Sequence, residues 1–254
     1  MQSDANSPRR RKPTLYITGD STTGLNPPGS RTGKKVSWSD VFEGHIKKSS
    51  CQFSNQAIPG YSLRDFFHRG PLDQILPQAR QGDIILACHG HLESTPLTRK
   101  GRRARGCLPG SGDQSVIVYD AFFGREEVIH TFAWYLKNYI HRCQAAGVIL
   151  VLLSPPVRCV WENGRILRTR SLEYANNMQE ARDALGACYL DFGAITQNHL
   201  NTIGPERSRQ LYLMESDQIH TTLAGAQIFA HLLAATLHEQ YPEIFAKVLK
   251  RPVA

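Results

Sequence analysis

Short runs of apolar residues recur along the chain, each ending at a glycine or a polar residue, and they predict the strands of a sheet. The clearest are 83–88, which reads Asp-Ile-Ile-Leu-Ala-Cys, and 148–153, which is apolar at every position. Continuous apolar runs of this length are typical of strands buried on both faces, as in a parallel sheet. The predicted strands are 14–18, 51–57 (the weakest), 83–88, 148–153 and 188–191.

Longer segments with a helical repeat separate these strands. Residues 128–146 place apolar side chains three and four positions apart, and Gly147 follows as a stop signal. Segments 172–185 and 223–241 have the same pattern. Strands that alternate with helices indicate βαβ units with right-handed crossovers. The chain is therefore predicted to be an α/β protein with a central parallel sheet of about five strands.

The segment 92–124 departs from this alternation. It is rich in glycine, proline and charge and has no apolar period, so we interpret it as a long loop that leaves the third predicted strand. Neither an internal repeat nor a change of composition marks a domain boundary. We therefore expect a single domain over 13–254, preceded by a disordered basic tail over 1–12.

The composition narrows the class of protein. The chain has 254 residues, 41% of them hydrophobic, which is enough for a substantial core without cross-links. No stretch approaches 18 consecutive apolar residues, so a transmembrane helix is not expected. The cysteines are scattered without a Cys-x-x-Cys pair, which argues against a zinc site or a disulfide framework. No secretory signal follows the basic tail, which favours a cytoplasmic protein, although a secreted chain trimmed of its signal would read the same.

The net charge of +8 is the one unusual number. A basic balance of this size suits nucleic acid, an anionic membrane surface or an acidic substrate. No DNA- or RNA-binding motif accompanies the charge, and aromatic residues are not interleaved with the basic runs, so a nucleic-acid role is disfavoured. The densest run, at 99–105, is interpreted as a solvated loop, with a cationic rim for an anionic substrate as the alternative.

Residues that follow the predicted strands are the candidates for chemistry, because ligands of an open parallel sheet bind at the carboxyl ends of its strands. The first strand is followed by Gly19-Asp20-Ser21-Thr22, in which Ser21 presents both a hydroxyl and a backbone N–H. Near the C-terminus, Asp217-Gln218-Ile219-His220 is predicted to open a helix.

These two motifs contain the parts of a nucleophilic site. A serine becomes a good nucleophile only when a base removes its proton, and His220 can be that base. Asp217, three residues earlier on the same turn, can orient the imidazole and stabilise its protonated form. The backbone N–H groups of Ser21 and Gly60 are candidate donors for the developing oxyanion. Each motif alone is weak evidence, and their order at strand ends is what strengthens them.

Together the motifs resemble the SGNH or GDSL-like hydrolases, and within them the rhamnogalacturonan acetylesterase-like branch. The matching blocks are 19–22, 55–66, 103–112, 130–136, 154–161 and 217–226, so the resemblance covers nearly the whole chain. It implies a three-layer α/β/α flavodoxin-like fold, a serine nucleophile, no metal and no cofactor. It also implies Ser21, Asp217 and His220 as the triad, with Ser21 and Gly60 as oxyanion donors.

A further block, at 90–93 after the third predicted strand, departs from the family pattern. The family has Gly-His-Asn-Asp there, and the Asn side chain is the third oxyanion donor, whereas this chain has Gly90-His91-Leu92-Glu93. Leucine carries no donor, and the loss of one such donor costs roughly 10²–10³ in rate. His91 and His89 are candidate substitutes. The candidate substrate contacts are Asn55, His89, His91, Trp161, Arg103 and Arg105.

These observations support three hypotheses. The first is a serine esterase that hydrolyses an acyl ester, most simply an acetyl ester, of a small molecule or saccharide, with neither nucleic acid nor membrane as partner. The second is an SGNH scaffold repurposed for acyl transfer, cyclisation or elimination on an intracellular metabolite, because Leu92 replaces the oxyanion asparagine. The third is an inactive binding protein, which the complete triad disfavours. The sequence makes no prediction of oligomeric state.

Overall fold

The computed structural model describes residues 11–24, 35–100, 102–168, 171–214 and 217–251. A parallel sheet lies at its centre, with the strand order β2-β1-β3-β6-β9. Its strands are β1 (Thr14–Gly19), β2 (Gln52–Asn55), β3 (Ile84–Cys88), β6 (Ile149–Leu153) and β9 (Cys188–Leu190). The predicted five-stranded parallel sheet is thus confirmed.

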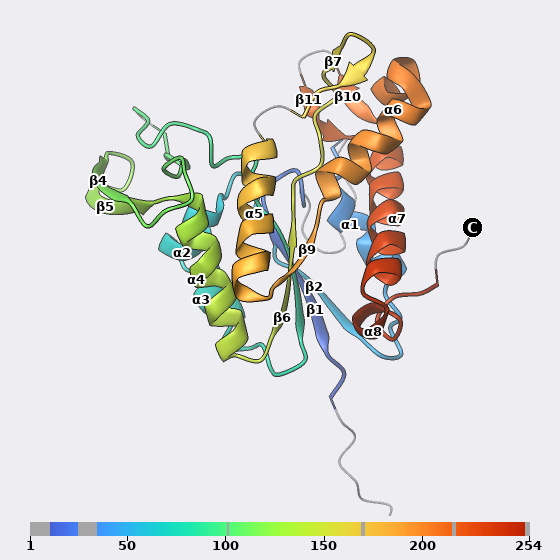
Figure 1. Ribbon diagram of the computed structural model, residues 1–254, viewed down its shortest axis with the longest axis horizontal. Coiled ribbons are helices and arrows are strands. Elements are labelled where there is room, and N and C mark those ends of the chain that lie inside the picture. Colours follow the sequence, from blue (N-terminus) through green and yellow to red (C-terminus); the bar gives the residue numbers. More distant parts are fainter. Residues whose placement is uncertain (1–10, 25–34, 101, 169–170, 215–216, 252–254) are drawn as a thin grey trace, which may run out of the picture.

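Helices cover both faces of this sheet and make three layers (Figure 1). One face carries α1 (Trp38–Phe42), α6 (Phe192–Gln210), α7 (Leu223–Gln240) and α8 (Pro242–Phe245), with a short 3-10 helix at Glu43–His45. The other face carries α2 (Leu63–His68), α3 (Pro71–Ile75), α4 (Phe132–Ala145) and α5 (Ser171–Leu185). None of the described helices is long and apolar enough to cross a membrane.

The strands are apolar at successive positions because each one contributes to two cores. Leu15 and Ile17 pack into the core beneath α7, whereas Tyr16 between them packs into the core beneath α4. Ile84 and Ile85 divide between the same two cores. A strand between two helical layers has no solvent face, which explains why the sequence shows continuous rather than alternating hydrophobicity.

The predicted helix over 128–146 and the predicted loop over 92–124 both need correction. The structure has a β-hairpin there, formed by β4 (Ser115–Asp120) and β5 (Arg125–His130), and α4 begins only at Phe132. Thr131 caps that helix, because its hydroxyl accepts the N–H of Trp134 at 3.1 Å. Within β5, Glu127 and Ile129 are buried while their neighbours are not, which is the two-residue period of a strand.

The C-terminal motif also adopts another conformation than the predicted helix start. Asp217 begins strand β11 (Asp217–Thr221), which pairs antiparallel with β10 (Tyr212–Met214). Helix α7 follows, and the Thr222 hydroxyl caps it by accepting the N–H of Gly225. The remaining short hairpin is formed by β7 (Trp161–Glu162) and β8 (Arg165–Ile166).

The last two residues of the predicted disordered tail, Arg11 and Lys12, contact the rest of the protein. Positions 1–10 of that tail lie outside the described residues. Arg11 forms an ion pair with the buried carboxylate of Asp83, and Lys12 donates to the carbonyl of Lys48 at 2.9 Å. Asp83 also accepts the N–H of Thr14 at 2.8 Å, so the last two tail residues are held against the start of the sheet.

Candidate active site

The turn after β1 places Ser21 at the carboxyl end of the central sheet. A Cβ atom at Gly19 would lie 2.3 Å from the Thr23 hydroxyl and 2.5 Å from the Cys88 carbonyl, so only glycine fits where β1 ends beside β3. The buried carboxylate of Asp20 accepts the backbone N–H and the hydroxyl of Thr22, both at 2.7 Å. Asp20 therefore shapes the turn, and Ser21 stands at its tip.

The structure brings Ser21, His220 and Asp217 into one hydrogen-bonded row. The Nε2 atom of His220 lies 2.9 Å from the Ser21 hydroxyl. On its other side, the Nδ1 atom lies 2.9 Å from Oδ2 of Asp217. The backbone N–H of His220 also donates to Oδ1 of Asp217, at 3.0 Å. The predicted contact between Asp217 and His220 is thus formed, but within the extended strand β11 rather than on a helical turn.

Asp217 has a second partner, the cation of Lys35, that the sequence did not reveal. Lys35 donates from Nζ to Oδ2 of Asp217 at 2.6 Å. Burial raises the pKa of Asp217, but the hydrogen bonds from Lys35 and His220 outweigh it and hold the pKa well below its usual range. The carboxylate is therefore charged at any pH at which the fold operates. No signal in the sequence connects positions 35 and 217.

Two backbone N–H groups near the end of β1 lack an acceptor among the described residues. Within the described residues, neither the N–H of Ser21 nor that of Gly60 has a hydrogen-bond acceptor. Gly60 adopts a positive φ of 78° in a turn that Ile58 fastens to β1 by donating to the Gly19 carbonyl at 2.9 Å. Ser62 then caps α2, with its hydroxyl accepting the N–H of Asp65. The turns that carry Ser21 and Gly60 are thus both attached to the end of β1.

The loop after β3 is held by a buried glutamate. Glu93 is 1% exposed, and its carboxylate accepts the N–H groups of Leu63 at 2.8 Å and of Gly90 and Leu92 at 2.9 Å. Burial raises the pKa of Glu93 to about 7. Glu93 thereby joins the start of α2 to the loop, and Leu92 occupies the position of the missing donor with an aliphatic side chain. The sequence interpretation identified Leu92 but gave Glu93 no role.

The two histidines of this loop lie in different surroundings. His89 is 2% exposed, packs edge-on against Phe66 and lies 3.3 Å from the Thr18 hydroxyl, and burial lowers its pKa to about 3. It is a core residue, and its prediction as a substrate contact is wrong. His91 has its Nε2 atom 3.4 Å from the guanidinium of Arg158, which only donates, so Nε2 is the acceptor. Burial also lowers the pKa of His91, and the ring is therefore neutral.

Two further candidate contacts serve the fold. The side-chain amide of Asn55 donates to the Ser39 hydroxyl at 2.8 Å, and its oxygen accepts the N–H of Ala57 at 3.1 Å. Both ends of this amide are thus used within the protein. Trp161 lies in the β7–β8 hairpin and packs, partly buried, against the core beneath α7.

The basic run at 99–105 divides into two parts. Arg99, Lys100 and Arg102 are exposed, as expected for a solvated loop. Arg103 and Arg105 are partly buried instead, and both lie against Gly60. The interpretation as a solvated loop is therefore correct only for the first part.

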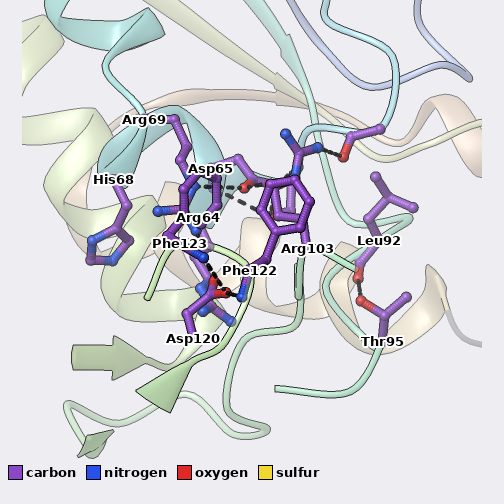
Figure 2. A network of polar contacts seen from close by, with 12 residues as sticks. Arg64, Asp65, His68, Arg69, Leu92, Thr95, Arg103, Asp120, Phe122 and Phe123 are labelled. Carbon is purple, nitrogen blue, oxygen red and sulfur yellow. Dashed lines mark hydrogen bonds and ion pairs between the residues drawn. The ribbon is translucent and has the colours of Figure 1, made fainter. Parts of the chain in front are cut away.

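A buried ionic network stands behind Gly60, and Figure 2 shows it between helix α2 and the β4–β5 hairpin. Arg64 is fully buried and pairs with Glu127 at 2.8 Å. Arg69 bridges Asp120 and Glu127, each at 3.2 Å. These charged side chains come from distant parts of the sequence and connect the β4–β5 hairpin to helix α2. No local sequence pattern indicates this connection. Within the described residues, no cluster of His, Cys, Asp or Glu is arranged to hold a metal ion.

This chain is similar to known proteins in both sequence and fold. No protein-family model matches it. It is similar to the rhamnogalacturonan acetylesterase of Emericella nidulans, with 27% identity over 218 residues that cover 85% of this chain and 81% of that protein. It is 26% identical to the rhamnogalacturonan acetylesterase RhgT of Bacillus subtilis over 237 residues, 89% of each chain.

Two solved structures extend the likeness at the level of the fold. The protein YxiM of Bacillus subtilis superposes with a TM-score of 0.71 at 23% identity, over 91% of this chain and 57% of that one. This chain thus spans little more than half of that structure. An acetylxylan esterase from Geobacillus stearothermophilus gives a TM-score of 0.58 at 16% identity, over 89% of this chain and 93% of that one.

Proposed function

We propose that this chain, an SGNH hydrolase distantly homologous to the rhamnogalacturonan acetylesterases, is a serine esterase that uses Ser21, His220 and Asp217 as its triad. The observation that carries the proposal is the unbroken row from the Ser21 hydroxyl through His220 to Asp217, with both contacts at 2.9 Å. The names of the relatives support an acetyl ester of a saccharide or a small molecule as the substrate.

The geometry supports the usual two-step acyl chemistry. His220 accepts the hydroxyl proton through Nε2 while the Ser21 oxygen attacks the ester carbonyl carbon. As the tetrahedral intermediate collapses, the ester C–O bond breaks and the imidazolium returns its proton to the departing alcohol. Water then attacks the acyl-serine with His220 again as the base, and the acid is released. Asp217 holds the Nδ1–H of His220 and stabilises its charged form throughout.

The negative charge that develops on the carbonyl oxygen needs donors that are already in place. The backbone N–H groups of Ser21 and Gly60 supply two of them. Both lie on turns fastened to the end of β1, so little reorganisation is required when the charge appears.

Acyl transfer to an alcohol is the second candidate function, and Leu92 is the observation that favours it. An aliphatic side chain at position 92 makes the loop after β3 less polar than the asparagine of the family pattern. The chemistry up to the acyl-serine is the same, and only the acceptor differs.

The cytoplasmic location expected from the sequence stays a prediction.

Release of 1-naphthol from 1-naphthyl acetate tests the proposal. The wild type should turn over, Ser21→Ala should lose activity by roughly 10⁴-fold or more, and Ser111→Ala, an exposed serine, should match the wild type. Adding a primary alcohol and measuring its acetate ester separates transfer from hydrolysis. Turnover that survives in Ser21→Ala, or a wild type with none, contradicts the proposed triad.

A further inference from the structure

Two arginines from the long segment after β3 lie against Gly60. Arg103 donates from Nη2 to the carbonyl oxygen of Gly60. Arg105 lies near the α-carbon of the same residue: a Cβ atom built on Gly60 would be 3.1 Å from the Nη2 atom of Arg105 and 3.3 Å from its guanidinium carbon. Because position 60 is a glycine, the guanidinium of Arg105 can approach the backbone whose N–H is the proposed oxyanion donor.

The two arginines differ in what they already bind. Arg103 is engaged by the Gly60 carbonyl, lies 3.5 Å from Oδ1 of Asp65, and covers the ring of Tyr61 at 4.1 Å. Arg105, in contrast, has no hydrogen bond or ion pair with any of the described residues, and its Nε atom is buried without an acceptor.

The environment of Arg105 is unfavourable for a cation. Burial lowers the pKa of Arg105 and the neighbouring charge of Arg103 lowers it further, while the charges of Asp65 and Asp20 offset part of this effect without forming an ion pair. A partly desolvated guanidinium without a close counter-ion is costly, and it is relieved when an anion arrives. Its placement beside Gly60 means that such an anion would lie at the candidate active site.

The backbone is anchored immediately after Arg105. The buried Arg64 donates from Nη1 to the carbonyl of Gly106 at 3.0 Å, and the N–H of Cys107 donates to the Glu93 carbonyl at 2.9 Å. Gly106 packs so closely that a Cβ atom there would lie 1.8 Å from the Thr95 carbonyl oxygen. Figure 2 shows Arg64 and Arg103 within the network that fixes this loop. The loop is therefore held in place before any substrate binds.

We propose that Arg105 supplies the oxyanion donor that Leu92 cannot, with its guanidinium beside the N–H groups of Ser21 and Gly60. The inference rests on the esterase function proposed above. When the Ser21 oxygen bonds to the ester carbon, the carbonyl π electrons move to the oxygen, and a guanidinium N–H donates to that oxygen without transferring a proton. The charge returns to the carbonyl as the alcohol departs. Charge-assisted hydrogen bonds are stronger than those of a neutral amide, so one guanidinium can take the place of an asparagine.

Hydrolysis of p-nitrophenyl acetate, an uncharged ester, tests this role. We expect Arg105→Met, which keeps the stem but removes the donors, to lower kcat by roughly 10²–10³-fold while KM changes little. Arg105→Lys should recover part of that loss, and Arg102→Met, an exposed arginine of the same loop, should behave as the wild type. Adding Leu92→Asn to Arg105→Met should restore at least tenfold, because the family's neutral donor then returns.

The matching single variant is Leu92→Asn in the otherwise unchanged protein, which tests whether a third oxyanion donor is already present. If Arg105 already donates to the oxyanion, this variant gains little, whereas a tenfold gain in kcat contradicts the inference. An Arg105→Met enzyme as fast as the wild type, or one that differs only in KM for a carboxylate-bearing ester, also overturns it and leaves the esterase standing. A wild type without Ser21-dependent turnover overturns both.

Discussion

The two sides of the candidate site are built in different ways. On the nucleophile side, Ser21, His220 and Asp217 contact one another directly at the ends of β1 and β11. On the donor side, Gly60 and Leu92 sit on loops whose positions depend on a buried ionic network several residues behind them.

This difference separates chemistry from stability. The carboxylate of Asp217 is 17% exposed and forms its ion pair with the half-exposed Lys35, so replacing it should disturb the reaction far more than the fold. Arg64, Glu127 and Glu93 are almost completely buried, so replacing them should disturb the fold first. Variants on the two sides are therefore expected to show opposite balances between lost activity and lost stability.

The largest expected effect is on the nucleophile side. Asp217→Asn keeps the shape of the side chain but removes the charge that stabilises protonated His220 and favours the wrong imidazole tautomer, so kcat should fall by about 10⁴-fold. The free energy of unfolding should fall by only about 1–2 kcal/mol, because the amide loses the ion pair with the half-exposed Lys35 but still offers an acceptor to the N–H of His220. Steady-state kinetics and urea unfolding of the same sample measure both. An Asp217→Asn variant that loses stability but keeps its activity would contradict the assignment of chemistry to the nucleophile side.

The donor side should respond in the opposite sense. Arg64→Met removes the cation that faces Glu127 at 2.8 Å and leaves a buried carboxylate with less compensation. The free energy of unfolding should fall by about 3–5 kcal/mol. The matched control is Arg142→Met, which breaks an exposed pair with Asp73 and should cost less than about 1 kcal/mol. Equal losses in the two variants would show that the network does not support the fold.

A smaller effect on the same side depends on pH through Glu93. Its pKa is about 7 in the folded protein, above the ordinary value of 4.5, because burial favours the neutral acid. Its stabilising contribution is thus complete below about pH 4.5 and is lost as the pH rises through 7, because the folded state binds more protons between these values. The full difference amounts to about 3 kcal/mol.

Unfolding of the wild type and Glu93→Gln, followed between pH 4.5 and 8, measures that contribution. The stability of the wild type relative to Glu93→Gln should decrease with rising pH, and Glu239→Gln, at an exposed position, should show no such trend. A difference that is constant with pH would mean that Glu93 stays charged when folded, as its three N–H donors favour.

The sequence predicted the central sheet because the strands are buried on both faces and show it as uninterrupted hydrophobicity. It did not predict the β4–β5 hairpin, whose Val116 and Ile117 are exposed and whose pairing depends on a partner strand rather than on a local repeat. Ile129 fitted the helical spacing of α4 although it belongs to β5. A single residue buried just before a helix carries the same signal as one inside it.

For the candidate site, the sequence was informative where the chemistry depends on short motifs. Ser21, Asp217 and His220 were identified from strand ends and spacing, and the structure places their side chains together. It could not indicate Lys35 or Arg64, because their partners lie 182 and 63 residues away. Nor could it distinguish buried His89 from partly exposed His91, since both follow the same strand.

Covalent labelling of Ser21 tests the central claim most directly. The protein is treated with a fluorophosphonate, which reacts only with a serine activated by a neighbouring base, and the site of the adduct is found by mass spectrometry of its peptides. The account predicts one adduct on Ser21 in the wild type, much slower labelling in Asp217→Asn, and none in Ser21→Ala. An unlabelled wild type, or an adduct on another serine, would contradict it.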